Sequence, residues 1–121
     1  MRRKWNKKDL YIASFVKDEY DDEGNKIPTY AEPEYIGKQN IQPLSGESDV
    51  AEYGTKVTKM QKVLLDYDKY LGKFKEKDVA YIEDTNPENE SVYGDNANYR
   101  IDSVRNQNKK IAIYFEKMPN K

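Results

Sequence analysis

Apolar and polar residues alternate in short runs along most of this chain, and turn-forming residues separate the runs. A period of two is typical of strands with one buried face. The pattern predicts six or seven strands, near residues 10–16, 27–36, 38–44, 55–65, 78–82, 99–105 and 111–115. Strands spaced in this way favour an all-β fold with minor helix, either a small antiparallel barrel or a sandwich.

Three of these runs carry further detail. Pro28 and Pro33 cannot donate ladder hydrogen bonds, so the second strand is expected at an edge or with a bulge. The run 55–65 is ambiguous, because its apolar residues fit a helical stripe as well as a strand. Residues 66–78 are charged and are expected to form a loop with some local structure.

The turns and ends of the elements are marked by their residue types. An acidic stretch at 18–25 contains Gly24 followed by Asn25, which predicts a hairpin there. Ser45 is placed to cap a short helix near residues 46–53, where Gly54 provides the stop. The last two strands form a second hairpin by pattern and turn chemistry. Its best core residues are Ile111, Ile113 and Phe115.

A length of 121 residues predicts one domain. Residues 1–9 are expected to form a basic N-terminal arm, and residues 10–121 a single β domain. Residues 85–97 form a long polar loop, and such loops are more often functional or mobile than idle. Hydrophobic and charged residues each make up 36% of the chain, and 11 tyrosines outnumber three phenylalanines. Tyrosine suits half-buried sheet faces and protein contacts.

The amino-acid composition argues against several classes of function. The chain has neither cysteine nor histidine, so the usual general bases, thiol nucleophiles and transition-metal ligands are lacking. The acidic stretches fail the spacing of a calcium loop. No apolar run reaches the roughly 20 residues of a membrane span, and the basic start lacks the apolar core of a signal peptide. We therefore expect no enzyme activity, no cofactor, no metal and no membrane.

Nucleic-acid binding is an alternative that the residues leave open. Small barrels bind single strands with stacked aromatic rings in a basic groove. Basic and aromatic residues gather on the terminal hairpin: Tyr99, Arg100, Arg105, Lys109, Lys110 and Tyr114. A net charge of −1 weakens this alternative, since phosphate contacts provide most of the affinity.

Three motifs occur in order along the chain. They are Ile41–Glu47 followed by Glu52-Tyr53-Gly54, then Lys77-Asp78-Val79-Ala80-Tyr81-Ile82, and then Tyr99–Val104. In order, spacing and total length the chain resembles the head-closure proteins of tailed bacteriophages, also called stoppers or head–tail connectors. The likeness runs from about Leu10 and is greatest to proteins of contractile-tailed, defective-prophage-like elements.

This resemblance implies a small β-barrel whose copies, often six or twelve, form a ring in the neck of a phage particle made in the bacterial cytoplasm. The implied partners are portal or adaptor proteins on one side and tail-terminator or tail proteins on the other, with packaged DNA passing through the channel. Some members close the channel with a loop. The resemblance leaves open which loop does so here. The candidates are residues 42–54, with Pro43, Ser45 and Glu47, and residues 85–97, with Asn89, Tyr93 and Asp95.

Charge clusters of opposite sign indicate how copies would join. The basic arm carries Trp5 as an anchor for a neighbouring subunit, and the first hairpin carries an acidic turn. The expected partner interface comprises Arg2, Arg3, Lys4, Trp5, Asp21 and Asp22. A tail-completion or tail-terminator protein is a second alternative, because such proteins share this composition and also form rings.

Overall fold

The computed structural model of the chain describes residues 7–44, 59–82, 85–107 and 109–118. The strands are β1 (Lys8–Ala13), β2 (Phe15–Tyr20), β3 (Lys26–Tyr30), β4 (Glu34–Gln39), β5 (Gln42–Pro43), β6 (Met60–Asp66), β7 (Val79–Ile82), β8 (Tyr99–Gln107) and β9 (Lys110–Lys117). A four-residue helix, α2 (Tyr67–Tyr70), follows β6. All described strand pairs are antiparallel, which confirms the all-β fold with minor helix.

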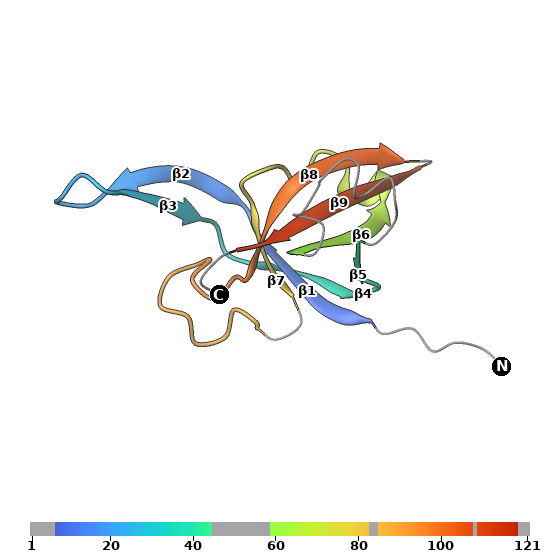
Figure 1. Cartoon of the computed structure of the whole chain (residues 1–121), viewed down its shortest axis with the longest axis horizontal. Helices are drawn as coiled ribbons and strands as arrows, with labels where there is room; N and C mark the ends of the chain where they lie inside the picture. The colour runs from blue at the N-terminus through green and yellow to red at the C-terminus, as the bar shows by residue number, and fades with distance from the viewer. Residues whose placement is uncertain (1–6, 45–58, 83–84, 108, 119–121) are drawn as a thin grey trace.

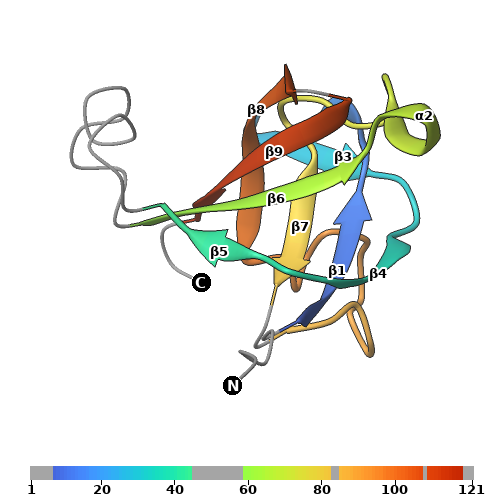
Figure 2. The same cartoon turned by 90° about the vertical axis from the view of Figure 1, so that its right-hand side faces the viewer.

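Seven strands form one sheet in the order β4-β1-β7-β8-β9-β6-β5, and β2 and β3 form a separate pair. The two end strands of the large sheet, β4 and β5, are consecutive in the chain and are joined by Asn40 and Ile41. One extended segment therefore pairs with β1 at its start and with β6 at its end. The sheet curls like a small barrel (Figure 2), although its hydrogen-bonded ladder does not close.

The inside of the curled sheet holds the main core. Its members are Leu10, Ile12, Ile36, Ile41, Val63, Leu65, Tyr70, Phe74, Ala80, Ile82, Tyr99, Ile101, Ile111, Ile113 and Phe115. The predicted core positions Ile111, Ile113 and Phe115 are at most 2% exposed, so that prediction is confirmed. Ala112 and Tyr114 point to the other side of β9 and pack with Leu44 and Met60 in a smaller cluster.

Three predicted strands are shorter or divided in the structure. The predicted strand 38–44 covers the end of β4 and all of β5, with Asn40 and Ile41 between them. The predicted strand 27–36 is split into β3 and β4, because the chain leaves the ladder at residues 31–33. The predicted strand 10–16 ends at Ala13, and β2 then starts a new pairing at Phe15. Pro28 lies on β3, an edge strand, as expected for a residue that has no backbone N–H to donate.

Other predictions are settled or fall outside the described residues. The ambiguous run forms a strand from Met60, because β6 pairs with β9 along its whole length. Residues 66–78, expected as a loop with some local structure, contain the four-residue helix α2. The helix predicted near residues 46–53 lies outside the described residues, as do residues 1–6 of the basic arm. No helix in the described part of the chain has the length and hydrophobicity needed to cross a membrane.

Candidate assembly surfaces

A hairpin of two strands projects away from the sheet (Figure 1). We call it the projecting hairpin and define it as residues 14–31, with β2 and β3 as its strands. These two strands pair with each other and with no strand of the seven-stranded sheet. Because an isolated two-stranded hairpin is marginally stable in water, contacts at its base must hold it in place.

Asp21 builds the turn at the tip of the projecting hairpin. Its Oδ1 accepts hydrogen bonds from the backbone N–H groups of Glu23 and Asn25, at 2.9 and 2.8 Å. Gly24 takes a φ of +84°, which glycine adopts without strain. The hydrogen bond from the Asn25 backbone is the main cause that lowers the pKa of the Asp21 carboxyl. The hairpin predicted at this acidic turn is therefore present, with a negatively charged tip.

Large apolar side chains are exposed on both faces of the projecting hairpin. Val16, Tyr20 and Ile27 are 57%, 68% and 46% exposed. Tyr20 lies opposite Lys26, and the adjacent pair in the ladder is Ile27 with Glu19. Since adjacent pairs point to opposite faces, Tyr20 and Ile27 face opposite sides. Both faces of the projecting hairpin therefore offer apolar area to a partner, as Tyr and other large apolar side chains do at protein interfaces.

Aromatic packing fixes the base of the projecting hairpin. The rings of Phe15 and Tyr30 meet edge to face, with centroids 6.0 Å apart. The backbone N–H of Ala31 donates to the carbonyl of Ser14 at 2.8 Å. The ring of Tyr30 lies against Gly94, so closely that an added Cβ would come within 2.4 Å of it. The direction of the hairpin is thus set by contacts with the loop that precedes β8.

A buried carboxylate, Asp78, ties the start of the projecting hairpin to the sheet. Asp78 is the only polar or charged side chain that is buried among the described residues. Its Oδ1 accepts the backbone N–H of Phe15 at 2.8 Å, and its Oδ2 accepts that of Lys75 at 3.1 Å. Burial raises the pKa of the Asp78 carboxyl, while the two N–H groups oppose the shift.

Replacing Asp78 with Asn should lower the free energy of unfolding by about 1–2 kcal/mol, because the amide presents an NH₂ group to one of the two backbone donors. Asp78→Ala should cost about 2–3 kcal/mol, since both donors then lose their partner. Urea unfolding measures both effects. Asp66→Asn is the matched control, because Asp66 is exposed and forms a surface ion pair with Lys110 at 3.0 Å. Equal stability of Asp78→Asn and the control would contradict the role of Asp78.

A hydrogen-bond network around Glu90 holds the long polar loop. The Glu90 carboxylate accepts the hydroxyl of Tyr81 at 2.8 Å and the backbone N–H of Asn96 at 2.9 Å. The Tyr81 hydroxyl also accepts the backbone N–H of Gly94 at 2.8 Å. Burial, followed by the bond to Glu90, raises the pKa of Tyr81 well above its ordinary value. Gly94 therefore lies between Tyr81 in the sheet and Tyr30 in the projecting hairpin.

Four of the six candidate channel-loop residues lie in the described part of the chain. Asn89, Tyr93 and Asp95 are exposed on the loop that Glu90 holds, and Tyr93 is 49% exposed. Pro43 is exposed on β5, at one end of the large sheet. The structure therefore brings three of the six together on one loop. Ser45 and Glu47 lie outside the described residues.

The expected partner interface is described only in part. Asp21 and Asp22 are exposed at the tip of the projecting hairpin. Arg2, Arg3, Lys4 and Trp5 lie outside the described residues. The pattern of the sequence did not reveal Val16, Tyr20 and Ile27 as surface residues, because alternation predicts a strand without showing that the strand leaves the sheet.

A groove of about 540 Å³ lies where β1 begins and where β4, β5 and β6 meet. We call it the lysine groove, because Lys7, Lys38 and Lys62 line it together with polar residues and Leu64. None of the described residues that line it is acidic. No local pattern in the sequence marks these three lysines as neighbours, since they come from separate parts of the chain.

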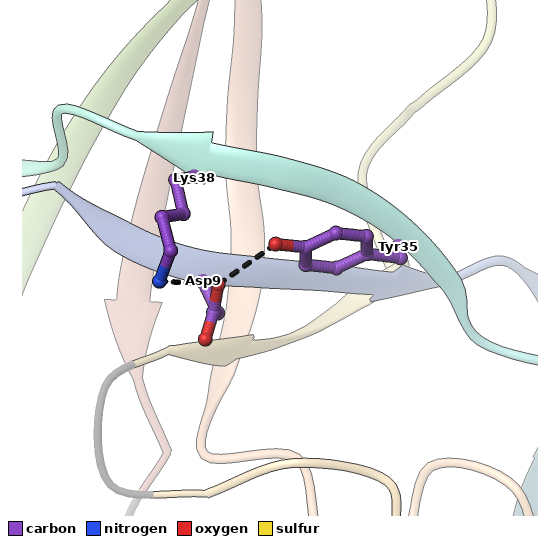
Figure 3. A network of polar contacts seen from close by, with 3 residues as sticks. All are labelled: Asp9, Tyr35 and Lys38. Atoms are coloured by element: carbon purple, nitrogen blue, oxygen red, sulfur yellow. Dashed lines mark hydrogen bonds and ion pairs between the residues drawn. The ribbon is translucent and has the colours of Figure 1, made fainter.

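Next to the groove, a polar network orders Lys38 (Figure 3). The carboxylate of Asp9 accepts the hydroxyl of Tyr35 at 2.8 Å and pairs with Nζ of Lys38 at 3.1 Å. The bond from Tyr35, followed by that from Lys38, lowers the pKa of Asp9. The same bond to Asp9 raises the pKa of Tyr35. Asp9 offsets part of the charge of Lys38, which leaves Lys7 and Lys62 as the other cations of the groove.

The terminal hairpin does not offer its tyrosine rings for stacking. Tyr99 and Tyr114 are only 8% and 4% exposed. Lys62 and Arg105 lie 5.4 and 5.1 Å from the centroid of the Tyr114 ring. Arg100 pairs with Glu116 at 3.2 Å. Bases stack on accessible ring faces, so this hairpin lacks the surface that single-strand binding would require of its tyrosines.

Comparison with known proteins places the chain in no group: no family model, curated protein or solved structure matches it. Within the described ranges, no cluster of three or more acidic residues is arranged to hold a metal ion. The described features that distinguish this molecule are therefore the projecting hairpin, the loop held by Glu90 and the lysine groove.

Proposed function

We propose that this protein is a structural subunit of a phage-like particle and forms a ring that joins the head to the tail. In this role it binds copies of itself, a portal or adaptor protein and a tail protein, and it catalyses no reaction. The observation that carries the proposal is the projecting hairpin, which extends away from the sheet (Figure 1) and carries exposed apolar side chains.

A projecting hairpin with a fixed base suits assembly for physical reasons. Its outer backbone edges are unpaired, and such edges bind other chains unless they are covered. The contacts of Phe15, Tyr30 and Asp78 at its base fix its direction, which reduces the entropy lost on binding. A subunit that contacts its neighbour through one surface and is contacted through another forms a ring when the rotation closes.

The proposed location of the protein at the head–tail junction rests on the resemblance of its sequence to head-closure proteins. The described parts of all three motifs contribute strands to the sheet, since β5 covers Gln42–Pro43, β7 covers Val79–Ile82 and β8 begins at Tyr99. The Tyr81 of the second motif holds the loop through Glu90, and Asp78 of the same motif holds the projecting hairpin. These residues thus support the two exposed segments that the proposal uses for contacts.

Particles blocked at one stage of assembly test this proposal. Heads made without tails should contain the protein, and free tails made without heads should lack it. The presence of the protein on free tails, and its absence from heads, would replace head closure with the tail-completion alternative. Its absence from both would contradict a structural role in the particle.

Single-strand binding remains the other alternative, and the lysine groove is the one observation that favours it. A titration with a fluorescent oligonucleotide over a range of salt concentrations separates the two functions. A dedicated binder loses affinity steeply as salt rises, because each phosphate contact releases counterions. We expect weak binding without sequence preference.

A further inference from the structure

We propose that the acidic tip of the projecting hairpin of one copy docks in the lysine groove of a second copy of this chain. The inference rests on the proposed function as a ring-forming subunit and names the contact between neighbours. It follows from the charge of the two surfaces, from their apolar residues and from their positions in the fold.

The tip carries a net negative charge that the hairpin itself does not neutralise. The projecting hairpin holds five acidic and two basic side chains. Both basic residues face carboxylates of the hairpin strands: Lys17 lies 3.6 Å from Glu19, and Lys26 lies 3.4 Å from Asp18. The carboxylates of the turn, Asp21, Asp22 and Glu23, are all exposed. A cation-lined surface would complement this tip.

The lysine groove supplies that surface. Its volume of about 540 Å³ and its open form admit a turn of the chain, and the charged side chains among its described lining residues are all lysines. Leu64 in the same lining is 47% exposed and offers apolar area to Tyr20 or Ile27 of an incoming hairpin. The groove therefore matches the projecting hairpin both in charge and in apolar contact.

The positions of the two surfaces favour a second copy over the same chain. The tip of the projecting hairpin and the strand ends that form the groove lie toward opposite ends of the long axis (Figure 1). The contacts of Tyr30 and Asp78 keep the hairpin from folding back. Each copy therefore presents one acidic and one basic end. When the acidic end of one copy binds the basic end of the next, the contact is heterologous, and contacts of this kind build rings or chains.

Charge reversal with rescue tests the docking. Asp22→Lys with Glu23→Lys reverses the tip and spares Asp21, which builds the turn. Lys7→Glu with Lys62→Glu reverses the groove and spares Lys38, which pairs with Asp9. Each pair should weaken self-association about tenfold or more at low salt, as measured by sedimentation velocity. All four changes in one chain should restore it, because the surfaces again have opposite charge.

The matched control is Lys69→Glu with Lys117→Glu. It makes the same change in net charge at exposed lysines outside the groove and should leave self-association unchanged. Circular dichroism confirms that every variant is folded. The docking would be overturned if the variant with all four substitutions did not regain self-association while both double variants were folded. Rings that form unchanged in all variants would overturn it as well, while leaving the proposed function intact.

A covalent test covers the case in which a reversed variant does not fold. The chain has no cysteine, so Glu23→Cys with Lys62→Cys introduces the only two thiols. Head-to-tail docking should give a ladder of disulfide-linked multimers under mild oxidation, and either single variant should give none. The absence of a ladder would overturn the docking. Loss of oligonucleotide binding in the Lys7→Glu, Lys62→Glu variant, without any loss of association, would instead assign the groove to phosphate.

Discussion

Replacing Gly94 with Ala should destabilise the protein by about 3 kcal/mol and displace the projecting hairpin. Gly94 has a φ of +90°, where a side chain is strained, and its Cβ would lie 2.4 Å from the ring of Tyr30. That ring also contacts Phe15, so it cannot yield without moving the hairpin base. Urea unfolding measures the loss of stability, and the NMR signals of residues 14–31 report the displacement.

Gly72→Ala provides the matched control for this prediction. Gly72 has a similar φ of +72°, but nothing lies within 4 Å of the position of its Cβ. This substitution should cost about 1 kcal/mol, the strain of the backbone alone. The difference in the free energy of unfolding between the two variants measures the effect of the contact with Tyr30. Adding Tyr30→Val to Gly94→Ala should recover part of the difference, and equal costs at Gly94 and Gly72 would contradict the close packing.

Replacing Glu90 with Ala should destabilise the protein by about 2–4 kcal/mol and release the loop that precedes β8. The Tyr81 side chain is fully buried, so its hydroxyl would lose its acceptor in a place with little access to water. The backbone N–H of Asn96 would lose its acceptor as well. Urea unfolding and amide hydrogen exchange of residues 85–98 measure the two consequences.

Glu88→Ala is the control in the same loop, because the side chain of Glu88 is exposed. It should change the free energy of unfolding by less than about 0.5 kcal/mol. If Glu88→Ala and Glu90→Ala gave the same stability and the same exchange rates, the network around Glu90 would not hold the loop.

The same network predicts a dependence of stability on alkaline pH. The pKa of Tyr81 in the folded state is raised above the ordinary value of 10.0, so the neutral hydroxyl favours folding. This contribution is complete below pH 10 and is lost as the pH rises through the folded-state pKa. Tyr81→Phe should therefore make the fall in stability above pH 10 shallower. An unchanged slope would contradict the burial of this hydroxyl.

Local patterns predicted the parts of the fold that depend on local chemistry. The terminal hairpin was predicted because Ile111, Ile113 and Phe115 alternate next to a turn, and the structure buries all three. The break between β3 and β4 was not predicted, because alternation continues across residues 31–33 and the pairing partners change there. The run that begins at Met60 forms a strand because it pairs with β9, and a local sequence pattern does not identify that partner.

The contacts that position the exposed surfaces arise from tertiary structure and were not predicted. Asp78 and Glu90 are two among 22 acidic residues, and nothing nearby in the sequence marks them as buried or bridging. The lysine groove combines Lys7, Lys38 and Lys62, which are far apart in the chain. By contrast, the acidic tip was recognised from the sequence, because its charges are consecutive.

Native mass spectrometry of the wild-type chain over a range of concentrations tests most directly whether this molecule works as a ring-forming subunit. A closed oligomer of fixed copy number, six or twelve, is the predicted result, and its mass should stay constant as more protein is added. A single chain at every concentration, or a series of sizes that never closes, would contradict the proposal.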